Sequence, residues 1–232
     1  MIEIILTLDY EIYGDATGSL RELILEPAQS LMGLFQKWNC PLVVFVEVAE
    51  LERIYQERSD QDIEAVFQQI RELESQGHEI ALHLHPQWSG AKYQNGQWEV
   101  DLSEYNLCSL PEERIREIVS DGINFLRFIL GKSDYVPLSF RAGNWLFQPT
   151  QPAARILYEY GIMIDSSVFK GGRFKVYGVD YRKAGQNGFF WRFWEDVAEH
   201  DPQGQMIEIP IYTKLVPFWE MLSRKRLEIE KK

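Results

Sequence analysis

Residues 77–86 read Gly-His-Glu-Ile-Ala-Leu-His-Leu-His-Pro, and the remaining motifs of the chain can be placed around this stretch. Aliphatic residues alternate with other side chains through its second half, which is the period of a β-strand. Side chains two positions apart on a strand share a face, so His83 and His85 project together. Pro86 has no N–H group to donate and ends the strand. Because neutral imidazole is a common zinc ligand, the two histidines predict part of a metal site.

Composition limits the classes of function that fit this chain. The 232 residues are 45% hydrophobic and 25% charged, which is ordinary for a globular protein with a buried core. A formal net charge of -11 would be repelled by phosphates, so we expect no nucleic-acid partner. The sequence contains no apolar run long enough to cross a bilayer and no signal-peptide pattern, so we expect a cytoplasmic location. The oligomeric state is not indicated.

Strand and helix patterns alternate along the chain, which predicts a mostly parallel sheet with helical crossovers. The expected strands cover residues 2–8, 41–48, 79–85, 137–145, 162–164, 189–194 and 206–211. The expected helices cover residues 27–38, 49–57, 60–76, 111–130 and 151–160, with Asp60 as the N-cap of the third. Residues 170–187 are rich in glycine and charge and are expected to form an irregular loop. With no internal repeat or linker, one domain is expected.

A long segment, residues 87–110, follows the histidine strand. Its Asn-Gly pair at positions 95 and 96 lies between aromatic residues and predicts a β-hairpin. Long loops at the carboxyl ends of parallel strands often carry a binding surface. Trp88 and Trp98 can therefore stack on a sugar ring, or they can form a hydrophobic cluster that fixes this segment. The later Trp145 can line a sugar cleft, or it can belong to the core, where large apolar side chains are more common.

Two acids follow the first strand. Asp9 and Glu11 share a face if the extended conformation continues, and buried carboxylates need a cation, hydrogen-bond donors or water. A solvated loop whose acids cap the next helix is the alternative.

Four motifs in this order resemble the NodB-type polysaccharide deacetylases, which are carbohydrate esterase family four. They are Thr7-Leu8-Asp9-Tyr10-Glu11, residues 77–85, Phe140-Arg141-Ala142-Gly143-Asn144-Trp145 and Asp165-Ser166-Ser167. The likeness extends from the first strand to about Pro210 and is greatest to a divergent branch with a His-x-His-Pro motif. It implies a distorted (β/α) barrel of about seven mostly parallel strands, with an aromatic hairpin inserted after the third strand. This single domain would cover residues 1–232, and whether it lacks a C-terminal closing segment stays open.

The resemblance also implies roles for residues near the first and third strands. Asp9 matches the aspartate that acts as general base, and His83 matches the first histidine ligand of a divalent metal. The family's second aspartate, a metal ligand, is replaced by Tyr10, so Glu11 becomes the candidate oxygen ligand, with Asp9 as the alternative. The family's second histidine lies where this chain has Gln87, so His85 is expected to take that role.

The later motifs supply the remaining candidates. Arg141 matches the arginine that orients the catalytic aspartate, and Asp165 matches an aspartate that assists a histidine acid. The late strand has Glu208 and no histidine, so the general acid is unassigned. Glu208 is one candidate, although a solvated strand position is the favoured interpretation. Trp88, Trp98 and Trp145 are the candidate substrate-binding residues.

Together these features predict a metal-dependent hydrolase, with zinc as the expected cofactor. The expected reaction removes an acetyl group, most often an N-acetyl group, from a sugar or glycan precursor, by a metal-activated water and an aspartate base. Two alternatives stay open. One is a catalytically impaired barrel that binds a glycan or a protein partner, and the other is an amidohydrolase with a different small amide substrate.

Overall fold

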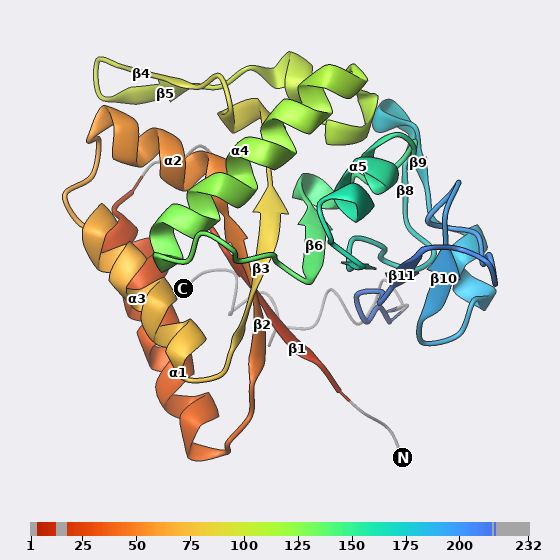
Figure 1. The fold of residues 1–232 in the computed structure, drawn as a ribbon, viewed down its shortest axis with the longest axis horizontal. Coiled ribbons are helices and arrows are strands. Elements are labelled where there is room, and N and C mark those ends of the chain that lie inside the picture. Colours follow the sequence, from red (N-terminus) through yellow and green to blue (C-terminus); the bar gives the residue numbers. More distant parts are fainter. Residues whose placement is uncertain (1–3, 13–17, 215, 217–232) are drawn as a thin grey trace.

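A seven-stranded, mostly parallel sheet forms the centre of the protein (Figure 1). This computed structural model describes residues 4–12, 18–214 and 216. The strands lie in the order β1-β2-β3-β6-β7-β11-β10, and only the last pair is antiparallel. Their bounds are β1 Leu6–Tyr10, β2 Leu42–Glu47, β3 Glu79–Leu84, β6 Ser139–Ala142, β7 Ile164–Asp165, β10 Trp191–Phe193 and β11 Met206–Glu208. The expected mostly parallel sheet is confirmed. Among the described residues, no pairing closes it between β1 and β10.

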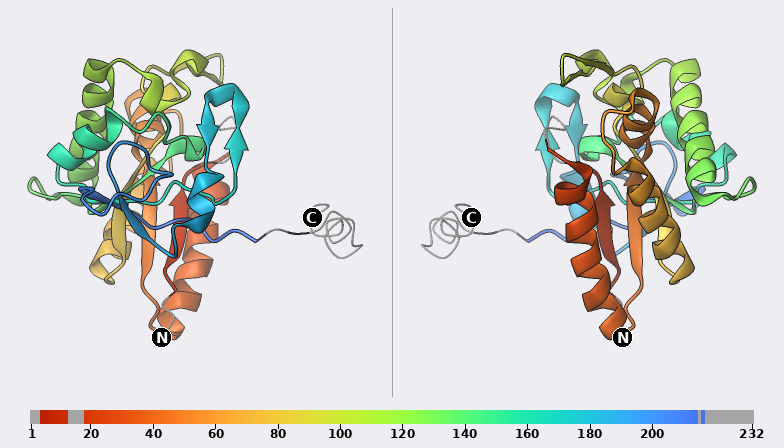
Figure 2. Two further views of the ribbon diagram at one scale, coloured as in Figure 1. Left: turned by 90° about the vertical axis from the view of Figure 1, so that its right-hand side faces the viewer. Right: turned by 90° about the vertical axis from the view of Figure 1, so that its left-hand side faces the viewer.

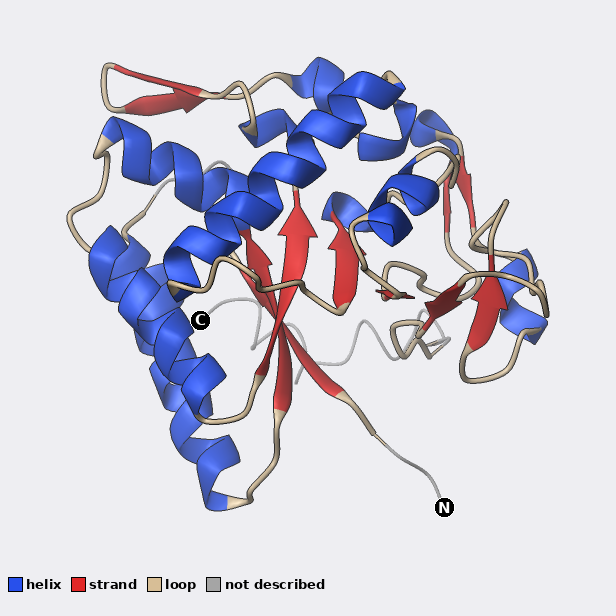
Figure 3. Ribbon diagram, viewed as in Figure 1, coloured by secondary structure: helices blue, strands red, loops and turns tan. Residues whose placement is uncertain are grey.

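Five α-helices lie around the outside of this sheet (Figure 3). They are α1 Glu26–Lys37, α2 Val48–Glu57, α3 Ile63–Ser75, α4 Glu112–Leu130 and α5 Ala153–Glu159. A short π-helical segment, η1 Arg21–Leu25, leads into α1. The 3-10 turns are η2 Pro86–Trp88, η3 Leu102–Glu104, η4 Leu107–Ser109, η5 Gly143–Trp145, η6 Lys175–Tyr177 and η7 Lys183–Gln186. Among the described residues, the helices are too short or too polar for any of them to cross a membrane.

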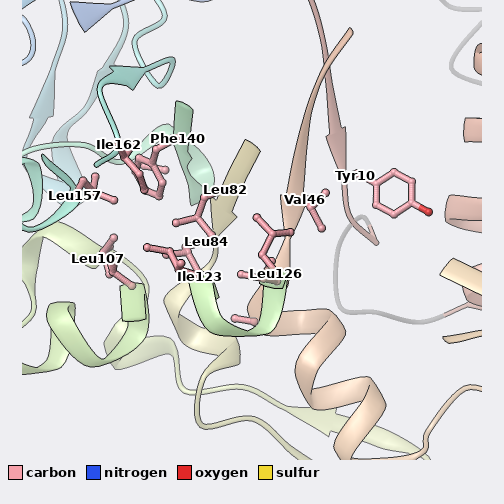
Figure 4. Close-up of a cluster of buried hydrophobic side chains, with 14 of the residues drawn as sticks. Tyr10, Val46, Leu82, Leu84, Leu107, Ile123, Leu126, Phe140, Leu157 and Ile162 are labelled. Atoms are coloured by element: carbon pink, nitrogen blue, oxygen red, sulfur yellow. The ribbon is translucent and has the colours of Figure 1, made fainter. Parts of the chain in front are cut away.

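The longest helix, α4, covers the middle of the sheet. Its apolar stripe includes Ile123 and Leu126, which belong to the same buried cluster as Leu82, Leu84 and Phe140 of the central strands (Figure 4). All five side chains are buried, and each contributes roughly 1.5–3 kcal/mol to the free energy of unfolding. Because α4 packs on the outer face of β3, it also helps to fix the position of the carboxyl end of this strand, which carries the histidines.

The sheet curls strongly, as one side-chain contact shows. Two strands separate β1 from β6, which corresponds to about 14 Å in a flat sheet with strands roughly 4.8 Å apart. Arg141 on β6 nevertheless donates to Asp9 and to Thr7 on β1. Its guanidinium lies over the ring of Phe45 on the intervening strand β2, 4.1 Å from the ring centre. The carboxyl ends of these strands therefore surround a common interior.

Two hairpins stand at the end of the sheet to which the parallel strands run (Figures 1 and 2). The predicted one is confirmed as β4 Lys92–Gln94 and β5 Gln97–Glu99. The prediction of an irregular loop over residues 170–187 was wrong, because the segment contains β8 Arg173–Phe174 and β9 Val179–Asp180. Strands of two residues are too short to produce a visible sequence period.

Two element boundaries also differ from the sequence prediction. The third helix begins at Ile63, and Asp60 lies before it, where its carboxylate accepts from the N–H groups of Asp62 and Leu20. Asp60 therefore closes the preceding turn. The first strand runs from Leu6 to Tyr10, later than expected, and Ile2 lies outside the described residues.

Candidate functional site

Four side chains meet at the carboxyl ends of the first three strands. Glu11 follows β1, Glu47 ends β2, and His83 and His85 lie in and just after β3. One ligand atom from each of them lies within 4.8 Å of all the others, so this cluster can hold a metal ion. Glu11 Oε2 is 2.9 Å from His85 Nε2 and 3.3 Å from His83 Nε2. The structure therefore brings together the three ligands predicted from the sequence.

A hydrogen bond to the backbone fixes the orientation of the His83 ring. Its Nδ1 lies 2.8 Å from the backbone carbonyl of Arg141, and a carbonyl can only accept. Nδ1 therefore carries a proton, and Nε2 is the atom that faces Glu11. Metal-binding histidines commonly donate their second ring N–H in this way, which fixes the tautomer and the ring orientation.

The charges of the cluster are strongly coupled. For Glu11, burial alone would raise the pKa, but hydrogen bonds from His83 and His85 and their positive charge lower it below its ordinary value. For His83, burial alone would lower the pKa, but the hydrogen bond to Glu11 and the charges of Glu47, Glu11 and Asp9 raise it to about 9. Without a metal ion, a proton on His83 compensates the acids. A divalent cation can replace that proton.

Glu47 is a functional candidate that the sequence analysis missed. Its Oε1 accepts from the N–H groups of Ala49 (3.0 Å) and Glu50 (3.2 Å), so it is the N-cap of α2. Its Oε2 accepts from the N–H of His85 at 2.7 Å, and burial raises the pKa of its carboxyl group. In the sequence Glu47 ends an apolar strand and precedes a helix, a position that is equally typical of an acid that only caps the helix. Its place opposite His83 depends on the sheet register, which the sequence does not show.

Asp9 lies beside the cluster in an ion pair with Arg141. Arg141 is buried and also donates to Thr7 Oγ1 (3.2 Å), to Ser166 O (2.8 Å) and to Ser166 Oγ (3.0 Å). These bonds fix the guanidinium, which in turn fixes the Asp9 carboxylate. The Asp9 side chain is 28% exposed, so water or a substrate can reach it.

Asp165 and Glu208 form a second, fully buried pair of acids. They lie opposite each other on β7 and β11, and both are 0% exposed. The interpretation of Glu208 as a solvated strand residue was wrong, because β11 lies inside the sheet between β7 and β10. Asp165 accepts from Ser167 N (3.1 Å) and Ser167 Oγ (2.7 Å), and Glu208 accepts from Val168 N (3.1 Å). Burial raises the pKa of both carboxyl groups, so the pair holds a proton.

The three candidate tryptophans have different surroundings. Trp88 is only 5% exposed and packs edge-on against Trp98, which also contacts Tyr93, so these rings fix the β4–β5 hairpin. Trp145 is 41% exposed and follows Asn144, whose amide nitrogen is 3.4 Å from His85 Nδ1. Of the three, Trp145 offers the most ring surface beside the cluster.

The amide side chain of Gln87 lies next to His85. Its Nε2 is 3.2 Å from His85 Nδ1, and among the described residues its buried Oε1 has no hydrogen-bond partner. If the amide oxygen and nitrogen of Gln87 are exchanged, its oxygen accepts from the Nδ1–H group of His85. The Nε2 atom of His85 is then left for a metal. Gln87 can therefore support His85 as a ligand.

The sequence matches no protein-family model and no curated protein. Three chains of solved structures match, among them the following two, both at low identity. One is the allantoinase Puue, with a TM-score of 0.42, 17% identity and coverage of 80% of this chain and 43% of that one. The other is a probable polysaccharide deacetylase from Pseudomonas aeruginosa PAO1, with a TM-score of 0.41, 21% identity and coverage of 79% and 43%. The chain thus spans less than half the length of either protein.

Proposed function

We propose that this chain is a metal-dependent hydrolase that removes an acetyl group, most often an N-acetyl group, from a sugar or glycan precursor. The cluster of two histidines and two glutamates beside the Asp9–Arg141 pair carries the proposal. The order of sequence motifs that resemble NodB-type deacetylases supports it. In this proposal residues 1–232 form one distorted (β/α) barrel, and the strong curl of the sheet between β1 and β6 supports that fold.

The proposed ligands are His83, His85 and Glu11, with Glu47 close enough to contribute an oxygen. A set of imidazole nitrogens and carboxylate oxygens suits zinc and related divalent ions. When bound, such an ion supplies a Lewis acid that polarises a carbonyl and makes water acidic near neutral pH. Arg141 supports the ligand set through its backbone carbonyl, which holds His83 Nδ1.

The remaining residues bind, orient and move protons. Asp9 accepts the proton of the attacking water, and Arg141 holds the Asp9 carboxylate in the orientation that this transfer requires. Trp145 and Trp98 offer ring faces to the sugar, and Trp88 holds Trp98 in place. Asp165 is buried and directly precedes Ser166, whose backbone carbonyl accepts from Arg141. Its proposed role is to help hold Arg141 in place.

Metal content tests the first part of the proposal. The purified protein is expected to bind about one divalent ion per chain, and His83→Ala or His85→Ala is expected to abolish stoichiometric binding. His78→Ala is the matched control, because His78 is also buried but accepts a hydrogen bond from Leu42 N away from the cluster. A wild-type protein that gains no metal on soaking would exclude the hydrolase mechanism.

Acetate release tests the reaction. Asp9→Asn is expected to lower kcat on acetylated sugars by roughly 10²–10⁴-fold, because it removes the general base while metal content is retained. Metal binding without acetate release from any acetylated sugar would favour the impaired, glycan-binding alternative. Hydrolysis of other small amides, with acetylated sugars left intact, would favour the amidohydrolase alternative.

A further inference from the structure

The geometry points to Tyr181 as a positioning residue of the candidate metal centre, acting through the turn at Gly143–Trp145 on the imidazole of His85. This inference rests on the proposed function, since it takes His85 as a metal ligand. Tyr181 follows β9, and it was in neither the sequence-derived site nor the His/Glu cluster.

His85 lacks the carbonyl contact that holds His83. Its Nδ1 faces two side-chain amides, Gln87 Nε2 at 3.2 Å and Asn144 Nδ2 at 3.4 Å. The ring also lies directly on Gly143, where a Cβ atom would come within 2.7 Å of His85 Cγ. The orientation of His85 therefore depends on where the backbone of this turn lies.

The turn has an unfavourable backbone conformation. Asn144 (φ 55°) and Trp145 (φ 58°) are consecutive and both lie in the left-handed region, although neither is glycine. Such residues persist where the surrounding structure fixes them, and they concentrate at functional sites. Something outside the turn must hold it in place.

The hydroxyl group of Tyr181 does so from the core. It donates to Trp145 O at 2.7 Å and accepts from Phe147 N at 2.9 Å, so one atom holds the peptide groups on both sides of Leu146. The side chain is fully buried, and burial keeps the pKa of the hydroxyl group well above its ordinary value. The hydroxyl group therefore stays protonated and remains a donor.

Tyr181 is itself fixed by the β8–β9 hairpin. Its backbone N–H donates to Gly172 O at 2.8 Å, and its carbonyl accepts from Gly171 N at 3.2 Å. The Phe169 ring packs edge-on against the Tyr181 ring, with 5.4 Å between the centroids. A continuous set of contacts thus runs from the hairpin through Tyr181 and the turn to His85.

Tyr181→Phe tests the inference, since it removes only the hydroxyl group. Tyr135→Phe is the matched control, because its hydroxyl also donates to a backbone carbonyl, Ile80 O at 2.6 Å, but near the start of β3. The readouts are the ring nitrogen NMR signals of both cluster histidines in the metal-free protein and the affinity for Zn²⁺. Tyr181→Phe should shift the His85 signals, leave the His83 signals unchanged and weaken Zn²⁺ binding roughly 10–100-fold. Tyr135→Phe should change neither the histidine signals nor the Zn²⁺ affinity.

Asn144→Gly provides a second, independent variant, since glycine tolerates the positive φ but removes the amide beside His85. Asn144→Gly should also change the His85 signals and leave the His83 signals unchanged. This measurement does not depend on whether Tyr181→Phe folds. Unchanged His85 signals in the folded variants, or equal changes at His83 and His85, would overturn the inference. Absence of Zn²⁺ binding by the wild type would contradict the proposed function, while the metal-free NMR signals would still decide the role of Tyr181.

Discussion

His83 can hold either a proton or a metal ion on its Nε2 atom. Its Nδ1 donates to Arg141 O, so any further proton sits on Nε2, which is also the proposed ligand atom. The surrounding acids raise the pKa of His83 to about 9, so at neutral pH this nitrogen is protonated in the metal-free protein. A metal ion must displace that proton when it binds.

We therefore expect metal affinity to rise as pH rises, by up to about tenfold per pH unit, and to level off above about pH 9. The sign follows because the protonated, non-binding form is favoured below the pKa of His83 and is lost above it. Calorimetry in buffers of different ionisation enthalpy should count about one proton released per ion near pH 7. A pH-independent affinity between pH 6 and 9 would contradict this expectation.

Individual residues also show how far the sequence predicts the site. His83, His85 and Glu11 could be placed together, because strand period and the order of strands bring them to one edge. Glu47 could not, because its role depends on its register opposite His83. Trp88 was ambiguous for a similar reason, since ring packing against Trp98 decides its exposure.

The pairing of β7 with β11 places two acids side by side. Asp165 and Glu208 are register partners on two neighbouring strands near one edge of the sheet, and two buried carboxyl groups so close cannot both ionise. Among the described residues Glu208 Oε2 accepts no hydrogen bond, so a proton on this oxygen can be donated to Asp165. The strand pair is therefore most stable when one proton is present.

Glu208→Gln is expected to raise the free energy of unfolding at pH 8 by about 1–3 kcal/mol. The reason is that an amide N–H can donate to Asp165 at any pH, whereas the carboxyl group of Glu208 must first be protonated. In the wild type, burial raises the folded-state pKa of Glu208 above its unfolded value, so stability is full below the unfolded pKa and falls as pH rises toward the folded one. The variant should lose much of this slope.

Urea unfolding from pH 5 to pH 8 measures the effect of Glu208→Gln. Glu79→Gln is the control, because Glu79 also lies on a strand but bonds to the hydroxyl of Ser139 at 2.5 Å. A variant that is less stable than wild type at pH 8, or that keeps the full pH slope, would contradict a shared proton.

Secondary-structure elements were predictable where they are long. The apolar stripe of α4 and its terminal Gly131, with φ 66°, specify that helix locally. The β8–β9 hairpin was missed because its strands have two residues each and its position depends on the buried Tyr181. Local signals thus predict the large elements, while tertiary contacts determine the small ones.

A metal ion would add a further link between the ends of three strands, beside the Glu11–His85 and Glu47–His85 contacts. Its ligands come from the ends of β1, β2 and β3, so binding should stabilise the folded chain as a unit. At 100 times the dissociation constant, the gain is about 2.7 kcal/mol. Thermal unfolding with Zn²⁺ and with chelator should show this difference in Tm for the wild type and for His78→Ala, and little difference for His83→Ala. Equal metal-dependent shifts in all three would contradict a site at His83.

The ion pair between Asp9 and Arg141 also sets an order of events during protein synthesis. The two residues are 132 positions apart, and Arg141 is fixed in turn by Ser166. A nascent chain can pair its first three strands early, but Asp9 can pair with Arg141 only after the fourth strand of the sheet has left the ribosome. The proposed general base is therefore made 132 residues before the arginine that orients it.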